Sequence, residues 1–327
     1  RSCFTIVSVP YSSLTARMTD DSDERTKLTT ARMIAASFGT LSMSALGFPL
    51  VAWYGEGNEA LGFVFLGAIS GLIAVVVLGV TIKSVQERQF EFNKESLPSF
   101  SKVTKSVANN YPFWIVFSSI LILGSTAIMF NKNLIYYVKY ALDMHDSQGL
   151  ILGVLSATAF LSIPLWSFLA LKIGKKNAWL CSMTILFFGL IIFYIYPVQG
   201  ISELLIILGF IGIGNGATGV IFWSMLPDTI EYGEWKTGVR TESSLYGFMT
   251  FAQKGAIAIA ALSLGWILTI IEFTPNTIQS IETIENLKFV MAWIPISGIL
   301  ISFILVCFYP IDSDFHKKLI KEINEKN

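Results

Sequence analysis

Long apolar segments recur along the whole chain, separated by shorter polar connections. Apolar runs fall at 29–53, 59–82, 112–138, 148–171, 178–197, 203–226, 244–271 and 287–310. Each run is long enough, as an α-helix rising about 1.5 Å per residue, to cross a hydrocarbon core of about 30 Å. A transmembrane β-barrel would instead show alternating segments of about ten residues. The pattern predicts an all-α polytopic membrane protein with eight spans, and residues 2–14 resemble the end of a further one.

Lysine and arginine are distributed unevenly among these connections. Every second connection is rich in them, whereas the intervening ones contain only Lys139 and Lys288. Because basic residues concentrate in cytoplasmic connections, this asymmetry places the basic set and the C-terminal tail in the cytoplasm. The sequence starts at Arg1 without a signal-peptide pattern, so we expect an internal start and a multi-pass location in a bacterial inner membrane.

The longest polar connection divides the predicted helices into two groups. Residues 83–111 are charged, contain Pro98 and predict a cytoplasmic linker. They separate the remainder of an N-terminal helical bundle, 1–82, from a C-terminal six-helix bundle, 112–310, with a cytoplasmic tail at 311–327. Two six-helix bundles form the layout of the major facilitator type. On that layout, about the first three and a half helices would precede this sequence.

Composition narrows the classes of function. Charged residues make up 14% of the chain and its mean hydropathy is +0.62, whereas a soluble domain carries about a quarter charged residues. The net charge of zero gives no indication of a nucleic-acid partner. Within the predicted spans we find no carboxylate pair and no cluster with metal-ligand spacing, and His145 and His316 lie outside them. We therefore expect neither an enzyme, nor a metal site, nor a bound cofactor.

The segment 222–262 places many charges next to an apolar helix. It contains Asp228, the run Glu231-Tyr232-Gly233-Glu234-Trp235-Lys236-Thr237-Gly238, then Arg240, Glu242 and the pair Lys254-Gly255. This order resembles the signature of the glycoside–pentoside–hexuronide:cation symporter family, the melibiose-permease-like branch of the major facilitator superfamily. The early residues Val9-Pro10-Tyr11, Thr19-Asp20, Glu24-Arg25-Thr26 and Arg32 resemble the family's connection after its fourth helix.

The resemblance implies a secondary active transporter working by alternating access. Its partners would be a glycoside, pentoside or hexuronide and a coupling cation, Na⁺, Li⁺ or H⁺, with the protein monomeric in the lipid bilayer. In the family an acidic residue of the fourth helix helps to bind a galactoside, and Ser8 stands at that place here. A sugar other than a galactoside is therefore expected. A lysolipid or other amphiphile carrier on the same fold is the alternative function.

Lys254 is the first candidate for the transport cavity. It lies roughly 15 Å inside the predicted span 244–271, where a cation is costly unless it faces water or a partner. We interpret it as lining a central cavity, with Thr250 one turn away on the same face. A structural ion pair or snorkelling to the interface are the alternatives. The resemblance adds that this lysine lies near both the sugar and the cation.

Other polar residues within the spans are candidates for the same cavity. Asn133 and Tyr136 lie near the outer end of 112–138, and Asn215 and Thr218 lie among glycines in 203–226. Their amide and hydroxyl groups suit sugar hydroxyls. Hydrogen bonds between helices and interfacial aromatic belts explain them equally well.

Two charged clusters follow equivalent span ends and predict a cytoplasmic gate. The first comprises Asp20, Asp21, Glu24 and Arg25, and the second comprises Asp228, Glu231, Glu234, Lys236 and Arg240. Alternating access requires contacts between bundles that form in one state and break in the other. We therefore predict ion pairs between the two clusters. The alternative is two solvated loops, because surface ion pairs contribute little.

Overall fold

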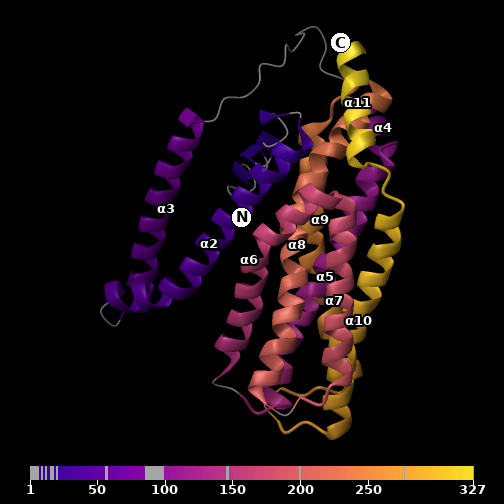
Figure 1. The fold of residues 1–327 in the computed structure, drawn as a ribbon. Helices are drawn as coiled ribbons and strands as arrows, with labels where there is room; N and C mark the ends of the chain where they lie inside the picture. Colours follow the sequence, from indigo (N-terminus) through magenta and orange to yellow (C-terminus); the bar gives the residue numbers. More distant parts are fainter. Residues whose placement is uncertain are drawn as a thin grey trace.

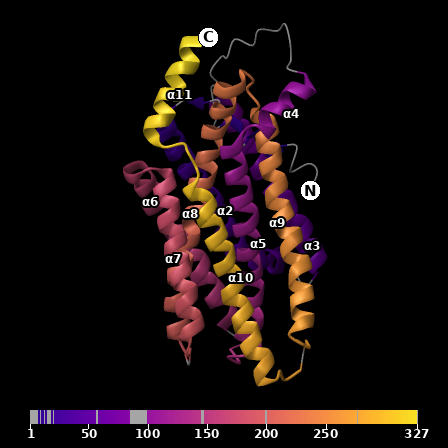
Figure 2. The same ribbon diagram turned by 90° about the vertical axis from the view of Figure 1, so that its right-hand side faces the viewer.

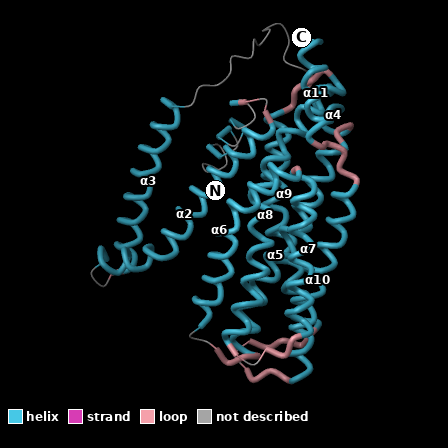
Figure 3. The backbone as a smooth tube through the Cα atoms, in the orientation of Figure 1, coloured by secondary structure: helices cyan, strands magenta, loops and turns pink. Residues whose placement is uncertain are grey.

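The computed structural model describes the chain except for residues 1–6, 9, 12, 15–17, 20, 56–57, 85–98, 145–146, 199, 276 and 327. The elements of the described residues are helices joined by short loops, as Figure 3 shows. They are α2 (Ser22–Gly55), α3 (Glu59–Ser84), α4 (Phe100–Ala108), α5 (Tyr111–Tyr140), α6 (Gln148–Ile173), α7 (Lys175–Ile195), α8 (Ile201–Thr237), α9 (Glu242–Ile270), α10 (Ile281–Cys307) and α11 (Ser313–Lys326). The all-helical prediction is confirmed.

Seven of the described helices, α3 and α5 to α10, are long and apolar enough to span a membrane. They coincide with seven of the eight predicted spans, and the eighth, 29–53, lies within the 34-residue helix α2. The chain is therefore an integral, multi-pass membrane protein. Helix α8 differs from its predicted span, because it continues past residue 226 to Thr237. The charged residues from Asp228 to Lys236 therefore lie on a helical extension rather than in a loop.

Helices α5 to α10 pack side by side, with α8 against α5, α6, α7 and α9, and with α10 against α5 and α7 (Figures 1 and 2). The contact between α6 and α8 is the closest packed, and glycines permit it. A Cβ atom on Gly212 would overlap Thr158 Oγ1, and one on Gly216 would overlap Ser162 Oγ. Small residues of this kind let helix backbones approach within a membrane.

Helix α2 runs obliquely away from this group, and α3 stands apart from it (Figure 1). Near its first turns α2 contacts α6 and α8, and farther along the chain it packs on α3. The apolar side chains of α3, such as Leu72 and Val76, are exposed. A helix that is apolar on all sides is stable only against lipid or other apolar helices. Among the described helices, α2 therefore connects α3 to the α5–α10 group.

One end of the molecule carries two further short helices, α4 and α11, and we call it the α11 end (Figure 1). Helix α4 lies in the predicted linker and α11 in the predicted tail, and both pack on α8. The Asn110 side chain caps α5 by accepting from Phe113 N at 3.2 Å and donates to Thr229 O at 2.7 Å. Leu319 of α11 is buried. The predicted tail is thus a docked helix.

The helix ends alternate between the two ends of the molecule as the basic connections predict. Helices α2, α7 and α9 start at the α11 end, and α3, α6, α8 and α10 finish there (Figure 1). Lys139, at the end of α5, and Lys288, at the start of α10, lie at the opposite end. For the described residues, the structure is therefore consistent with the basic connections lying at one end of the molecule.

Candidate functional site

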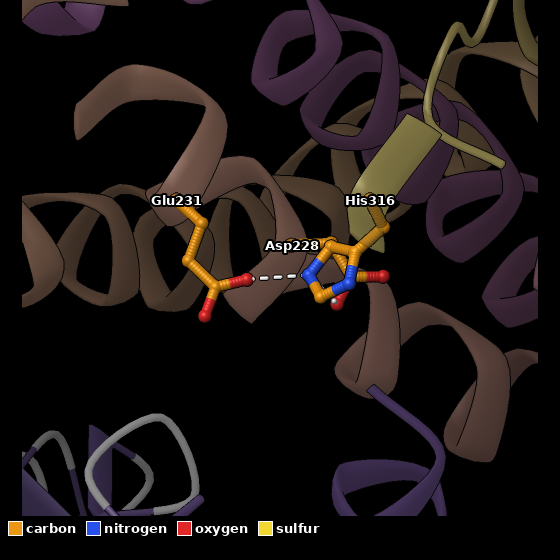
Figure 4. Close-up of side chains that lie close together, drawn as sticks. All are labelled: Asp228, Glu231 and His316. Carbon is orange, nitrogen blue, oxygen red and sulfur yellow. Dashed lines mark hydrogen bonds and ion pairs between the residues drawn. The ribbon is translucent and has the colours of Figure 1, made fainter. Parts of the chain in front are cut away.

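Five charged or titratable side chains meet at the α11 end, between four helices. They are Arg25 of α2, Lys175 of α7, Asp228 and Glu231 of α8, and His316 of α11, and we call them the buried charge cluster. Arg25 is 0% exposed, Asp228 3%, Glu231 1% and His316 4%. Figure 4 shows the three of them that come from α8 and α11. Charges so deeply buried require close partners.

The extension of α8 positions the two carboxylates. Asp228 and Glu231 are three residues apart, so they project from the same face of the helix. Pro227 precedes them and removes one backbone hydrogen bond of the helix. The helix ends at Gly238, whose φ of 68° is left-handed and readily adopted only by glycine.

Caps at two helix starts position the basic side chains. Asp21 Oδ1 accepts from the backbone N–H groups of Asp23 at 2.7 Å and Glu24 at 3.1 Å, which fixes the first turn of α2 that carries Arg25. The backbone N–H groups near Asp21 in turn hold the pKa of its carboxyl below its ordinary value, despite partial burial. At α11, Asp312 Oδ1 accepts from the backbone N–H of Phe315 at 2.7 Å, one residue before His316.

Each carboxylate of the cluster is shared between basic groups from different helices. Arg25 donates through Nη2 to Glu231 Oε1, and its Nη1 lies 3.6 Å from Asp228 Oδ1. Lys175 Nζ donates to Asp228 Oδ2 and to Ser224 O, both at 2.7 Å. His316 Nε2 lies 2.5 Å from Glu231 Oε2 and 3.7 Å from Asp228 Oδ1. The cluster therefore ties α2, α7 and α11 to the extension of α8.

Burial and charge act in opposite directions on His316. Burial alone favours the neutral imidazole, but the carboxylates of Asp228 and Glu231 outweigh it and raise the pKa of His316 above that of an ordinary histidine. For Arg25, the backbone carbonyl of Thr19 accepts from Nε at 2.7 Å and fixes the guanidinium. Removing one partner of such a buried pair typically costs about 3–5 kcal/mol, because the other charge remains buried.

The types of side chain in the cluster also suit a divalent cation. Ligand atoms of Asp228, Glu231 and His316 lie within 4.8 Å of one another (Figure 4). The positive charge such an ion would bring is already supplied by Arg25, which contacts both carboxylates, and by Lys175, which contacts Asp228. We therefore interpret the cluster as a network of ion pairs.

The other predicted gate residues make local contacts. Glu24 accepts from Thr19 Oγ1 at 2.6 Å. Arg240 pairs with Glu234 at 2.8 Å and Glu242 at 2.5 Å, joining the end of α8 to the start of α9. The two carboxylates outweigh burial and raise the pKa of Arg240, which keeps it charged. Lys236 donates to the carbonyl of Asn109, beside α4. Asp20 lies outside the described residues.

The predicted cavity residues are brought together only in part. Asn215 lines a cavity of about 360 Å³ between α2, α6 and α8, together with Ser37 and Thr40. It also lines a cavity of about 170 Å³ within the α5–α10 group, where Thr218 joins it. Asn215 is thus the shared wall of two cavities, one of which lies between α2 and the remaining helices.

The remaining candidates lie elsewhere. Lys254 is exposed near the middle of α9, and Thr250 donates its hydroxyl to Tyr246 O at 3.0 Å. Asn133 is buried with its Oδ1 unpartnered, while Tyr136 packs on another ring near the end of α5. Ser8 is half-buried in the first described residues. Among the described residues, none of these candidates lines either of the two cavities that Asn215 lines.

Sequence reasoning missed two residues of the cluster, Lys175 and His316. Lys175 lies in one of the basic connections and His316 in the predicted tail at 311–327, and neither position indicates a buried carboxylate partner. A second missed contact joins α2 to α8, where Arg32 lies 5.1 Å from the ring centre of Trp223. Trp223 in turn stacks on Tyr246 of α9, with ring centroids 6.3 Å apart. The amphipathic pattern of residues 313–326 could have indicated the burial of His316, because it predicts a helix that packs one face against the protein.

Charged side chains buried among the helices of a multi-pass membrane protein are rare and indicate a functional site. The chain belongs to the MFS/sugar transport protein family, whose sequence profile matches residues 1–313. The resemblance to the glycoside–pentoside–hexuronide:cation symporter type is thereby confirmed.

Three relatives show what this chain is similar to. It is 29% identical to the isoprimeverose transporter of Lactiplantibacillus pentosus, over 99% of this chain and 68% of that protein. It is 27% identical to the glucuronide carrier protein homolog of Escherichia coli K12, over 99% and 71% respectively. It is 26% identical to the putative glycoside/cation symporter YagG of Escherichia coli K12, over 94% and 66%.

Proposed function

We propose that this protein is a secondary active transporter that carries a sugar across the membrane together with a cation by alternating access. The family to which it belongs supports this function. Its relatives include an isoprimeverose transporter, a glucuronide carrier protein homolog and a putative glycoside/cation symporter. A glycoside, pentoside or hexuronide is the substrate class, and Na⁺, Li⁺ or H⁺ is the coupling cation.

The observation that carries the mechanism is the ion pair between Arg25 and the carboxylates of Asp228 and Glu231. It is buried, and it joins α2 to α8 at one end of the molecule. A contact between two helix groups that is strong in one state and broken in another is what alternating access requires. We call this contact the gate and assign it to the cytoplasmic side of a bacterial inner membrane. The two groups are residues 1–82 and 112–310, joined by 83–111 and followed by the tail at 311–327.

Sugar and cation would bind between these groups, on the far side of the gate. Asn215 faces the cavity between α2, α6 and α8 and offers an amide to sugar hydroxyls. Lys254 of α9, at mid-helix depth, would face the sugar or the cation in the binding-competent state. We assign Thr250, Thr218, Asn133, Tyr136 and Ser8 as further candidates for contacts along this path.

The test is uptake of radiolabelled glycosides by right-side-out membrane vesicles that carry the full-length protein. A neutral disaccharide and a glucuronide are each offered with a Na⁺ gradient, with a proton gradient and with neither. Accumulation above the external concentration under one gradient supports cation-coupled symport. Uptake of a labelled lysolipid without uptake of either sugar would instead show an amphiphile carrier. Equilibration without accumulation under every gradient would refute coupling.

A separate measurement determines on which side of the membrane the α11 end lies. Lys318 is exposed on α11, so a Lys318→Cys variant provides a target for thiol reagents that cannot cross the membrane. Labelling in inside-out but not right-side-out vesicles supports a cytoplasmic α11 end. Labelling in right-side-out vesicles alone would invert the proposed orientation.

A further inference from the structure

Two cavities of the molecule share the side chain of Asn215 as a wall. The cavity between α2, α6 and α8, which we call the sugar-side cavity, is lined in part by the hydroxyl-bearing residues Ser37, Thr40 and Ser156. The other cavity lies within the α5–α10 group, between α5, α7, α8 and α10, and we call it the inner cavity. Its volume of about 170 Å³ is comparable to the roughly 150 Å³ of an engineered protein cavity that binds benzene. The inner cavity is therefore large enough for one aromatic ring.

Both cavities lie at the same level along the helices. Asn215 is close to the middle of the apolar part of α8, 201–226. Thr40, in the sugar-side cavity, is close to the middle of α2. Thr126 and Pro295, in the inner cavity, are close to the middle of α5 and of α10. The two cavities are therefore neighbours near the midplane of the membrane, where secondary transporters bind their substrates.

The inner cavity has one polar wall, and its other walls are mainly apolar. Asn215 and Thr218 are three residues apart on α8, so they share one face of that helix. The walls on the other helices include Leu186 and Leu190 of α7 and Phe130 of α5. The Phe130 ring packs edge-to-face on another aromatic ring, with centroids 5.9 Å apart, which fixes its orientation. Such a cavity suits an apolar ring that is joined to a polar group at one end.

Close helix contacts beside the inner cavity keep it open. A Cβ atom on Gly214 of α8 would lie 2.6 Å from Leu186 Cγ, and one on Gly298 of α10 would lie 2.8 Å from Thr126 Cγ2. Helices α7 and α8, and helices α5 and α10, are therefore already in contact and cannot move closer to fill the space. The Thr126 hydroxyl donates to carbonyl groups of its own helix at 3.1 and 3.2 Å. The walls away from α8 thus favour an apolar occupant over water.

We propose that the inner cavity is an aglycone pocket: it receives a small apolar group, about the size of a phenyl ring, that is attached to the sugar in the sugar-side cavity. This inference rests on the proposed sugar transport and narrows its substrate class to glycosides with an apolar aglycone. Asn215 lines both cavities, so its amide would donate to the glycosidic oxygen at the junction of the two parts.

The expected preference for such an aglycone is large enough to measure. Removal of a phenyl-sized apolar group from water strengthens binding by about tenfold to a hundredfold, whereas a methyl group removes far less surface. Contact between the ring and Phe130 adds to this preference, because aromatic rings attract each other in edge-to-face and offset arrangements.

The test compares glycosides that differ only in the aglycone. Phenyl and methyl β-D-xyloside, and phenyl and methyl β-D-glucuronide, compete with uptake of a labelled glycoside by membrane vesicles that carry the full-length protein. In the pair whose sugar is recognised, the phenyl glycoside should inhibit at a concentration about tenfold to a hundredfold lower than the methyl glycoside. Phenol alone, which lacks the sugar, should not inhibit at these concentrations.

Two substitutions change the size of the pocket in opposite directions. Ala127→Leu on α5 places a larger side chain in the inner cavity, and the phenyl-over-methyl preference should fall to near one. Ile299→Ala on α10 enlarges the cavity, and the preference should shift from the phenyl to the 2-naphthyl glycoside. The control is Ala261→Leu, exposed on α9, which should keep the preference of the parent protein. Each preference is a ratio within one variant, so a change in the amount of folded protein cancels.

Each outcome supports or overturns the pocket. Equal inhibition by phenyl and methyl glycosides within twofold overturns it, as does inhibition by phenol as strong as that by the phenyl glycoside. A full phenyl preference in Ala127→Leu also overturns it. If Ala127→Leu is inactive, the parent protein and Ile299→Ala decide, and an unshifted preference in Ile299→Ala counts against the pocket. Accumulation of glycosides without any aglycone preference refutes this inference alone, whereas the absence of any glycoside uptake refutes the proposed function.

Discussion

Removal of the Arg25 guanidinium is the sharpest perturbation that the structure suggests. Arg25→Gln keeps a polar side chain of intermediate length but leaves Glu231 and Asp228 without their partner from α2. Loss of one member of a buried pair costs about 3–5 kcal/mol. Opening of the gate exposes the carboxylates of Asp228 and Glu231 to water and recovers part of this free energy. We therefore use the lower limit, about 3 kcal/mol. At about 1.4 kcal/mol per decade, the closed-to-open ratio should fall roughly a hundredfold.

The assay is thiol labelling of Met33→Cys, at a residue that lines the cavity between α2, α6 and α8, with and without Arg25→Gln. It uses inside-out vesicles and full-length protein whose native cysteines are replaced by serine. The matched control is Lys27→Gln, two residues away on the same helix, where the exposed lysine should be dispensable. Arg25→Gln should also abolish sugar accumulation, because a gate that cannot close dissipates the gradient. Combining Arg25→Gln with Glu231→Gln gives a double-mutant cycle, in which we expect a coupling above about 1 kcal/mol. A labelling rate for Arg25→Gln within twofold of the parent protein would refute this interpretation of the gate.

Three further substitutions, one of them paired with a control variant, test other parts of the structure. Lys254→Ala should abolish cation-coupled accumulation while membrane insertion, measured by the amount of protein in washed membranes, stays normal; unchanged accumulation would exclude its role in the cavity. Gly216→Ala should lower the unfolding midpoint in detergent, at a cost of about 1–3 kcal/mol, because the new methyl group overlaps Ser162. Gly209→Ala on the same helix, with its nearest neighbour 3.8 Å away, should leave the midpoint unchanged, and equal effects would contradict the packing argument. Asn110→Ala removes a helix cap and a buried hydrogen bond and should cost about 1–2 kcal/mol in the same assay.

The membrane helices could be predicted because each corresponds to an uninterrupted run of apolar residues. A run such as 287–310 has no water with which to satisfy its backbone, so length and hydropathy alone fix a helix there. The end of α8 could not be placed in this way. Its charged residues after Leu226 suggest a loop by hydropathy, although the helix continues to Thr237. The ion pairs with Arg25 and Lys175 stabilise those charges in a helix, and these partners are distant in sequence.

The residues of the candidate site were also predicted only in part. Asp228 and Glu231 were predicted to meet Arg25, and the structure brings these three residues together. Their function as a gate remains a proposal. Lys175 and His316 were missed because each is unremarkable in its own segment, one in a basic connection and one in a polar tail. Only packing of α7 and α11 against α8 gives these two side chains carboxylate partners.

The length of α8 also makes the protein sensitive to its lipid. A helix of 37 residues measures roughly 55 Å, well beyond a hydrocarbon core of about 30 Å. Asp228 and Glu231 therefore lie close to the level at which acyl chains give way to headgroups. In bilayers of longer acyl chains that level shifts toward the ion pairs and less water reaches them, while shorter chains leave them better hydrated. Reconstitution in lipids of graded chain length should therefore change the rate of transport even where no residue is altered.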